Sequence, residues 1–169
     1  MSSTKYTVKY RRKREGRTNY KKRLNLLKGK TDRLIIRKTN TQIILQIARY
    51  EPDGDKIIVT TRSTELRKKG WKHSCKNLPA AYLAGLILAK KAKEKKIKKV
   101  ILDSGLRTPL KGSRTFSALK GVTDGGLNVP VNEEIYPTEE RIKGEHVTYL
   151  EKHKTITQDF EKIKNTLKE

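Results

Sequence analysis

The residues with the clearest chemistry are the cations of the segment 10–30, YRRKREGRTNYKKRLNLLKGK, which contains a single acid, Glu15. Like charges at this density repel each other, so the segment cannot form a core by itself. A dense polyanion can neutralise it and gains free energy by releasing its own condensed counterions. Arginine forks bind phosphates in bidentate fashion, and a tyrosine among them can stack on an unpaired base, which contributes about 1–3 kcal/mol. The residues expected to bind RNA are Tyr10, Arg11, Arg12, Lys13, Arg14, Arg17, Tyr20, Lys21, Lys22 and Arg23.

Two alternatives compete with RNA binding for this segment. A membrane-surface helix needs a broad apolar face opposite its charges, and only Leu24, Leu26 and Leu27 are available for one. The interleaved tyrosines therefore favour RNA over a membrane. A solvated, disordered tail needs no partner, because runs of like charge are often only tails, and it stays the second alternative.

The whole chain shares this imbalance of charge. Its 169 residues include 41 Lys and Arg against 18 Asp and Glu, which gives a formal net charge of +23 and predicts a nucleic-acid partner. Basic residues recur in the ranges 62–76, 90–99 and 107–120, so we expect polyanion on several sides of the body. Within the last range, a second candidate RNA-binding group consists of Arg107, Lys111, Arg114 and Lys120.

Length and composition also predict the organisation of the chain. We expect a basic RNA-binding extension over 1–30, an α/β core domain over 31–130, and an extended segment with a C-terminal helical tail over 131–169. The single cysteine, Cys75, excludes an internal disulfide, and no metal site is expected. The N-terminus lacks an apolar signal, and the longest apolar stretch is about half of what a bilayer needs. We therefore expect a soluble intracellular protein that has no membrane partner.

Three segments rich in β-branched residues predict a sheet. The segments 33–39 and 42–50 are separated by Asn40-Thr41, which is typical of a hairpin turn, and 56–62 follows a strong turn signal at 51–55. Apolar residues alternate only partly along them. This pattern predicts an antiparallel three-stranded meander that buries mainly one face.

A helix must cover the buried face, and the segment 77–96 supplies it. Asn77 is a favourable N-cap, and Pro79 is tolerated in the first turn. The short apolar segment 98–104 follows this helix and predicts a strand parallel to a neighbour, so the sheet is mixed and the fold class is α/β. The helix residues expected to pack on the sheet are Tyr82, Leu83, Leu86, Ile87 and Ala89.

The loop 105–114 lies at the carboxyl end of this strand, where open α/β sheets place their sites. Ser113 can cap a helix that continues through about Lys120. Further on, apolar residues near helical spacing predict an amphipathic tail helix that docks on this protein or on a neighbour. These residues are Val147, Leu150, Ile156, Phe160, Ile163 and Leu167.

A nuclease of the ribonuclease-H-like fold is the enzymatic alternative, because that fold also opens with three antiparallel strands, a helix and a parallel strand. Two-metal cleavage needs several converging carboxylates. The segment 33–39 has none, the range 78–93 has none, and Asp103 is left alone. We interpret Asp103 as a cap for the turn at Gly105. No catalytic residue, cofactor or metal ligand is therefore expected.

Five blocks of the sequence are similar to those of a known family. They are RRKREGRTNYKKRLNLLKG (11–29), RLIIRKTNTQIILQI (33–47), GWKHSCKNLPAAYLAGLILAKKA (70–92), ILDSGLRTPLKGSRTFSALKGVTDGGLNVP (101–130) and EEIYPTEERIKGEHV (133–147). In their order and spacing, the chain resembles the archaeal form of the large-subunit ribosomal protein that binds 5S ribosomal RNA, number eighteen in the bacterial naming. Two features depart from the family: Asp32 stands where proline is expected, which should alter only a turn, and the range 148–169 has no matched counterpart.

The resemblance implies a structural protein of the large ribosomal subunit. It implies that the arm over 10–23 runs along ribosomal RNA and that the protein anchors 5S rRNA to the large-subunit rRNA in cytoplasmic ribosomes. The implied partners are these two RNAs and neighbouring large-subunit ribosomal proteins, with no small-molecule substrate. From charge alone, a general polyanion-binding or DNA-compacting protein stays the alternative.

Overall fold

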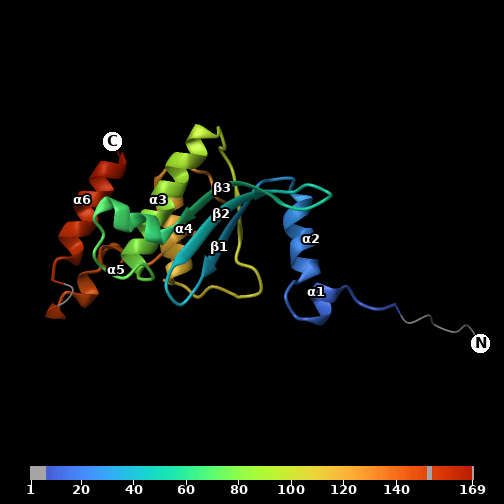
Figure 1. Ribbon diagram of the computed structural model, residues 1–169, viewed down its shortest axis with the longest axis horizontal. Coiled ribbons are helices and arrows are strands. Elements are labelled where there is room, and N and C mark those ends of the chain that lie inside the picture. Colours follow the sequence, from blue (N-terminus) through green and yellow to red (C-terminus); the bar gives the residue numbers. More distant parts are fainter. Residues whose placement is uncertain (1–6, 152–153, 169) are drawn as a thin grey trace, which may run out of the picture.

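A four-stranded sheet forms the centre of the computed structural model, which describes residues 7–151 and 154–168 (Figure 1). Its strands are β1 (Arg33–Lys38), β2 (Ile43–Arg49), β3 (Lys56–Arg62) and β4 (Ile101–Asp103). The strand order is β3-β2-β1-β4. β2 pairs antiparallel with β1 and β3, and β4 pairs parallel with β1. The predicted meander, parallel strand and mixed sheet are confirmed.

The two faces of β1 differ in chemistry because successive side chains of a strand point to opposite sides of the sheet. Leu34 and Ile36 are buried in the main apolar cluster. Arg33 and Arg37 alternate with them and therefore lie on the other face. The face of β1 away from the core thus presents guanidinium groups to the N-terminal segment.

The long helix α3 (Leu78–Glu94) covers the core face of the sheet and begins as predicted, with the Asn77 side chain accepting a hydrogen bond from the backbone N–H of Ala80 at 2.9 Å. Its orientation corrects one expectation. The residues Tyr82, Leu83, Leu86 and Ile87 do not pack on the sheet but belong to a second apolar cluster. The residues that join the sheet-side cluster are Ala81, Ala84, Leu88, Ala89 and Ala92.

Most of the sheet-facing residues of α3 were predicted wrongly because this helix is buried nearly all round. The spacing of its apolar residues therefore does not distinguish one face from another. Apart from Leu88, the α3 side chains that face the sheet and the helix α4 (Arg114–Asp124) are small, and neighbours approach closely there. Gly85 lies against Gly121 at this crossing: a Cβ on Gly85 would lie 2.2 Å from the backbone oxygen of Ala118, and one on Gly121 would lie 2.1 Å from that of Tyr82. The larger side chains are left for the opposite face.

C-terminal elements cover that opposite face. The predicted amphipathic tail helix is confirmed from residue 156 onward as α6 (Ile156–Lys168), whereas Val147 and Leu150, which were expected on the same helix, precede it. α6 docks on this protein because Ile156, Phe160 and Ile163 are buried in the second cluster with Tyr82. Trp71 is 2% exposed in the same cluster, which places it in the core. The remaining short elements are η1 (Ser63–Lys69), η2 (Glu133–Ile135), α5 (Glu139–Lys143) and η3 (Glu145–Val147).

The N-terminal segment lies at the opposite end of the molecule from α6 (Figure 1). It contains two short helices, α1 (Arg11–Arg14) and α2 (Tyr20–Lys28). The Asn19 side chain caps α2 by accepting a hydrogen bond from the backbone N–H of Lys22 at 3.0 Å. We call residues 7–30 the arm. Across the described ranges, no helix is both long and apolar enough to cross a membrane.

The contact between α3 and α4 leads to a prediction on stability. Gly85→Ala forces a methyl group into the backbone of α4, and we expect the free energy of unfolding to fall by about 1–3 kcal/mol because the two helices must separate. Urea denaturation measures this loss. The matched control is Gly29→Ala, where the nearest atom would lie at 3.7 Å and φ is −73°, so the change should stay below about 1 kcal/mol. Equal stability of Gly85→Ala and the unaltered protein would contradict the proposed close packing.

Candidate nucleic-acid interface

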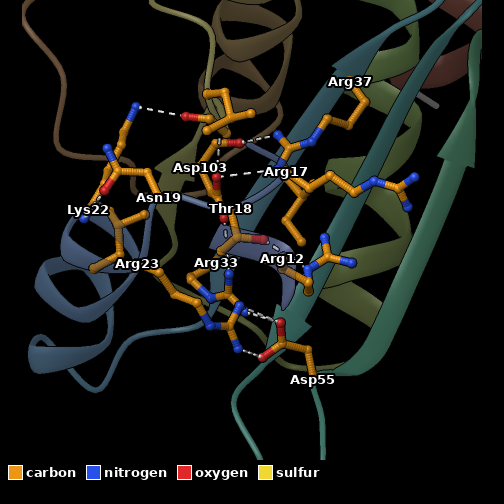
Figure 2. Close-up of a pocket in the computed structure, with 14 residues that line it drawn as sticks. Arg12, Arg17, Thr18, Asn19, Lys22, Arg23, Arg33, Arg37, Asp55 and Asp103 are labelled. Carbon is orange, nitrogen blue, oxygen red and sulfur yellow. Dashed lines mark hydrogen bonds and ion pairs between the residues drawn. The ribbon is translucent and has the colours of Figure 1, made fainter. Parts of the chain in front are cut away.

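The arm and the sheet enclose a cleft made of two adjoining pockets, of about 220 and 370 Å³. Arg12 and Arg17 of the arm line both pockets, as do Arg37 of β1 and the loop residues Gly105 and Leu106. Figure 2 shows the smaller pocket, with side chains of the arm facing those of the sheet. Residues far apart in sequence therefore meet in one basic cleft.

A chain of alternating charges forms the floor of this cleft. Arg23 donates two hydrogen bonds of 2.8 Å to the carboxylate of Asp55, and Nη2 of Arg33 lies 2.6 Å from Oδ2 of the same carboxylate. Nη1 of Arg33 donates to Oδ2 of Asp103 at 2.9 Å. Arg37 continues the chain with a contact of 3.3 Å to Oδ1 of Asp103 and a hydrogen bond of 2.7 Å to its backbone oxygen. We call this set the ion-pair chain.

Arg33 sets the energetics of the ion-pair chain because its side chain is only 2% exposed. A buried guanidinium is costly unless carboxylates pair with it, and here Asp55 and Asp103 do so from two sides. Its Nε and Nη2 atoms still have no hydrogen bond to any described residue, although Nη2 is in ionic contact with Asp55. Three guanidinium groups thus share two carboxylates, and the cleft floor stays positive.

The charge pairing also shifts acid–base equilibria. The hydrogen bonds from Arg23 lower the pKa of Asp55 below its ordinary value, aided by Arg33 and against the effect of burial. The same hydrogen bonds raise the pKa of Arg23. Both groups are therefore held in their charged forms.

Besides the pairing of Arg23 with Asp55, a second tether fixes the arm to the loop after β4. Nζ of Lys22 donates to Oγ of Ser104 at 3.0 Å and to the backbone oxygen of Gly105 at 3.1 Å. Together with Arg23, it holds α2 on the body. Two of the expected RNA-binding cations are thus engaged within the protein, and their contact with RNA stays a prediction.

The other cations of the arm are exposed. Glu15 pairs with Arg11 at 2.7 Å and with Arg17 at 3.0 Å, and Nε of Arg12 donates to Oγ1 of Thr18 at 2.8 Å. These bonds use one nitrogen of each guanidinium. The rings of Tyr10 and Tyr20 lie 5.4 Å apart, and Tyr10 is 74% exposed. The arm cations without an ion pair to any described residue are Lys9, Arg12, Lys13, Arg14, Lys21, Lys22, Lys28 and Lys30.

The structure divides the second predicted group. Arg107 is exposed and lines the larger pocket of the cleft, Lys111 is exposed in the same loop, and Arg114 donates to the backbone oxygen of Lys76 at 3.0 Å. Lys120 lies apart from them. It pairs with Asp124 at 3.2 Å and stands 5.3 Å above the ring of Tyr136.

Several residues of the interface were not predicted from the sequence, namely Arg33, Arg37, Lys38, Asp55 and Ser104. A signal for two of them was present, because Arg33 and Arg37 alternate with Leu34 and Ile36 and must therefore leave the core face. The positions of Asp55 and Ser104 depend on tertiary contacts. No local pattern marks them.

Asp103 is 8% exposed and accepts a hydrogen bond from the backbone N–H of Gly105 at 2.8 Å, which confirms its predicted role as a cap of that turn. Its carboxylate is also engaged by Arg33 and Arg37. In the described part of the chain, no three acidic, His or Cys residues lie close enough to hold a metal ion. The carboxylate cluster that a two-metal nuclease needs is not found among these residues.

An α/β core whose basic arm closes a cation-lined cleft defines a class of protein that binds a polyanion. The protein-family model described as "Ribosomal large subunit proteins 60S L5, and 50S L18" matches residues 4–100 and 90–132. The chain belongs to this family of large-subunit ribosomal proteins, as the resemblance implied.

Two curated relatives, both called "Large ribosomal subunit protein uL18", extend this result. One, from Korarchaeum cryptofilum, is 49% identical over 145 residues, which are 86% of this chain and 74% of that protein. Another, from Methanoregula boonei, is 44% identical over 165 residues, 97% of this chain and 95% of that protein. The second alignment includes most of the range 148–169, which corrects the expectation that this range has no counterpart.

Membership in the family settles the broad role of the chain. It is a structural protein of the large ribosomal subunit that functions in translation, and it is not an enzyme. The relatives of this chain therefore exclude the nuclease alternative.

The ion-pair chain leads to a prediction on stability and pH. Asp55→Asn removes the shared partner of Arg23 and Arg33, and we expect the free energy of unfolding at pH 7 to fall by about 1–3 kcal/mol. Because the folded-state pKa of Asp55 lies below the unfolded value of about 3.9, its contribution is complete above that value and is lost as pH falls through the lower folded pKa.

Urea denaturation from pH 7 to pH 3 measures the difference between the variant and the unaltered protein. The control is Asp53→Asn, an exposed residue of the same turn, which should change little at any pH. A loss for Asp55→Asn that is equal at pH 7 and pH 3 would show that the carboxylate charge is not the cause.

Proposed function

We propose that this protein binds 5S rRNA in the cleft between arm and sheet and fixes it to the large-subunit rRNA. The observation that carries the proposal is the cleft itself, where cations from the arm, β1 and the loop 105–112 converge and where Asp55 and Asp103 are the acidic residues among the described lining. The choice of 5S rRNA rests on the family resemblance of the arm and the four blocks after it. Cytoplasmic ribosomes are the proposed location, with neighbouring large-subunit ribosomal proteins as further partners.

We assign the cations of the interface two roles: some would position the arm, and others would bind phosphates. Lys22, Arg23 and Arg33 are engaged by the protein and would position the arm. Arg12, Arg17 and the loop cations Arg107 and Lys111 have donor nitrogens without a hydrogen bond to any described residue, and these would bind phosphates. A preformed cleft lowers the entropy that ordering the arm would otherwise cost on binding.

RNA of irregular shape suits this cleft better than a regular duplex. The described arm has only short helices, and sheet and loop lie behind it, so no long helix is available to enter a groove. Irregular RNA offers splayed phosphates and unpaired bases to such a surface. The exposed ring of Tyr10 would stack on one of those bases, supported by Tyr20.

Competition binding tests the proposal. We expect the full-length protein to prefer 5S rRNA over transfer RNA and over duplex DNA of equal charge, and to keep that preference at about 0.15 M salt. Equal binding to all three, which vanishes steeply with salt, would support the general polyanion or DNA-compacting alternative instead.

Substitution in the cleft gives a sharper prediction. Arg12→Gln with Arg17→Gln removes two exposed charges that line both pockets, so affinity for 5S rRNA should fall by about 10- to 100-fold or more. The slope of log affinity against log salt should become shallower by about 1.4–1.8. Lys68→Gln with Lys69→Gln, exposed on η1, removes the same charge elsewhere and serves as the control. Equal effects of the two pairs would refute a specific role for the cleft.

A further inference from the structure

A third basic pocket, of about 460 Å³, opens at the N-terminal end of α3. We call it the α3-end pocket. Among the described residues, four cations and one histidine line it, and none of these lining residues is acidic. These five residues are Lys38, Lys76, Arg114, Arg141 and His146.

Five separate segments bring these side chains together. Lys38 ends β1, Lys76 precedes α3, and Arg114 begins α4. Arg141 comes from α5, which is anchored because its neighbour Ile142 is 5% exposed in the second apolar cluster. Basic side chains from separate segments therefore meet at this surface, and one of these segments, α5, belongs to the C-terminal part of the chain.

The electrostatics of the α3-end pocket differ from those of the ion-pair chain. In the ion-pair chain, Asp55 and Asp103 compensate the arginines, whereas the described residues that line the α3-end pocket include no carboxylate. Burial lowers the pKa of Lys38, and the nearby charges of Arg114 and Arg107 lower it further. The hydroxyl of Ser113 at its edge is buried without a hydrogen bond to any described residue. Cations that repel each other in this way are stabilised when an anion joins them.

The α3-end pocket also shares a lining residue with the cleft. Lys38 lines both the larger pocket of the cleft and the α3-end pocket. Arg107 lies in the loop between them and acts electrostatically on Lys38. A polyanion that leaves the cleft along this loop would meet the α3-end pocket next. An acidic segment of a neighbouring protein would not explain why the two basic surfaces share a residue.

We propose that the α3-end pocket binds backbone phosphates of the RNA strand that continues out of the cleft, through Lys38, Lys76, Arg114 and Arg141. This inference rests on the proposed function, because the cleft must first hold an RNA. It extends the RNA-binding surface to α5, which no prediction from the sequence included. The bound RNA would thus span the end of the sheet from the arm to the C-terminal segment.

The test uses the full-length protein with Lys76→Gln and Arg141→Gln, two exposed side chains of this pocket. The matched control is Lys95→Gln with Lys98→Gln, which removes the same charge near the other end of α3, about 25 Å away. Affinity for 5S rRNA is measured across a range of salt, and nuclease protection maps the nucleotides covered. The same variants are also titrated with large-subunit rRNA alone.

We expect the pocket variant to bind 5S rRNA about tenfold or more weakly at 0.15 M salt, with a salt slope shallower by about 1.4–1.8. It should lose protection on one side of the footprint and keep the nucleotides whose protection depends on Arg12 and Arg17. The control pair should leave the footprint complete.

Two results would overturn the inference. One is an unchanged affinity and footprint on 5S rRNA. The other is a loss confined to large-subunit rRNA, which would assign the pocket to a different molecule. If the unaltered protein prefers no RNA, the proposed function fails, and the footprints of both variants on the RNA that it does bind still decide the role of this pocket.

Discussion

The burial of one guanidinium constrains the whole arrangement of arm and sheet. Arg33 lies on β1 beneath the cleft, and its charge is tolerated only because Asp55 and Asp103 reach it from the turn before β3 and from the end of β4. Those carboxylates in turn hold Arg23 of α2 and Arg37 of β1. Strand pairing, turn geometry and arm position are therefore coupled through a single buried charge.

The helix α3 is constrained in a different way, because it is buried on one side by the sheet and α4 and on the other by the C-terminal elements. Its alanines and Gly85 allow the sheet and α4 to approach closely, while Tyr82 and Leu83 fill the space beneath the C-terminal elements. The layers therefore succeed one another from α6 through α3 and the sheet to the arm (Figure 1). The basic cleft can be rigid because three layers stand behind it.

Much of this architecture follows from local sequence patterns. β-Branched runs and turn signals predict the meander, and amphipathic spacing predicts α6. The burial direction of α3 could not be predicted, because a helix that is apolar all round has no period that distinguishes the sheet from a second layer. For the site, clustered charge locates the arm, but the partners of Lys22 and Arg23 come from residues 82 and 32 positions away. Lys120 does not lie with the rest of its predicted group. It follows Arg114 by six residues on α4, and this spacing rotates its side chain by about 240° around the helix axis, away from that of Arg114.

The separation between Lys22 and Ser104 in the sequence determines when their tether can form during synthesis. On a chain synthesised from its N-terminus, the arm emerges first, and the second tether cannot form until 82 further residues have been added. At about 5–20 residues per second, this interval lasts roughly 4–16 s. Until Arg23 pairs with Asp55, the nascent arm is an undocked polycation next to the RNA of the translating ribosome. Early pairing of Arg23 with Asp55, which needs only 32 residues, shortens the period in which α2 has no intramolecular partner.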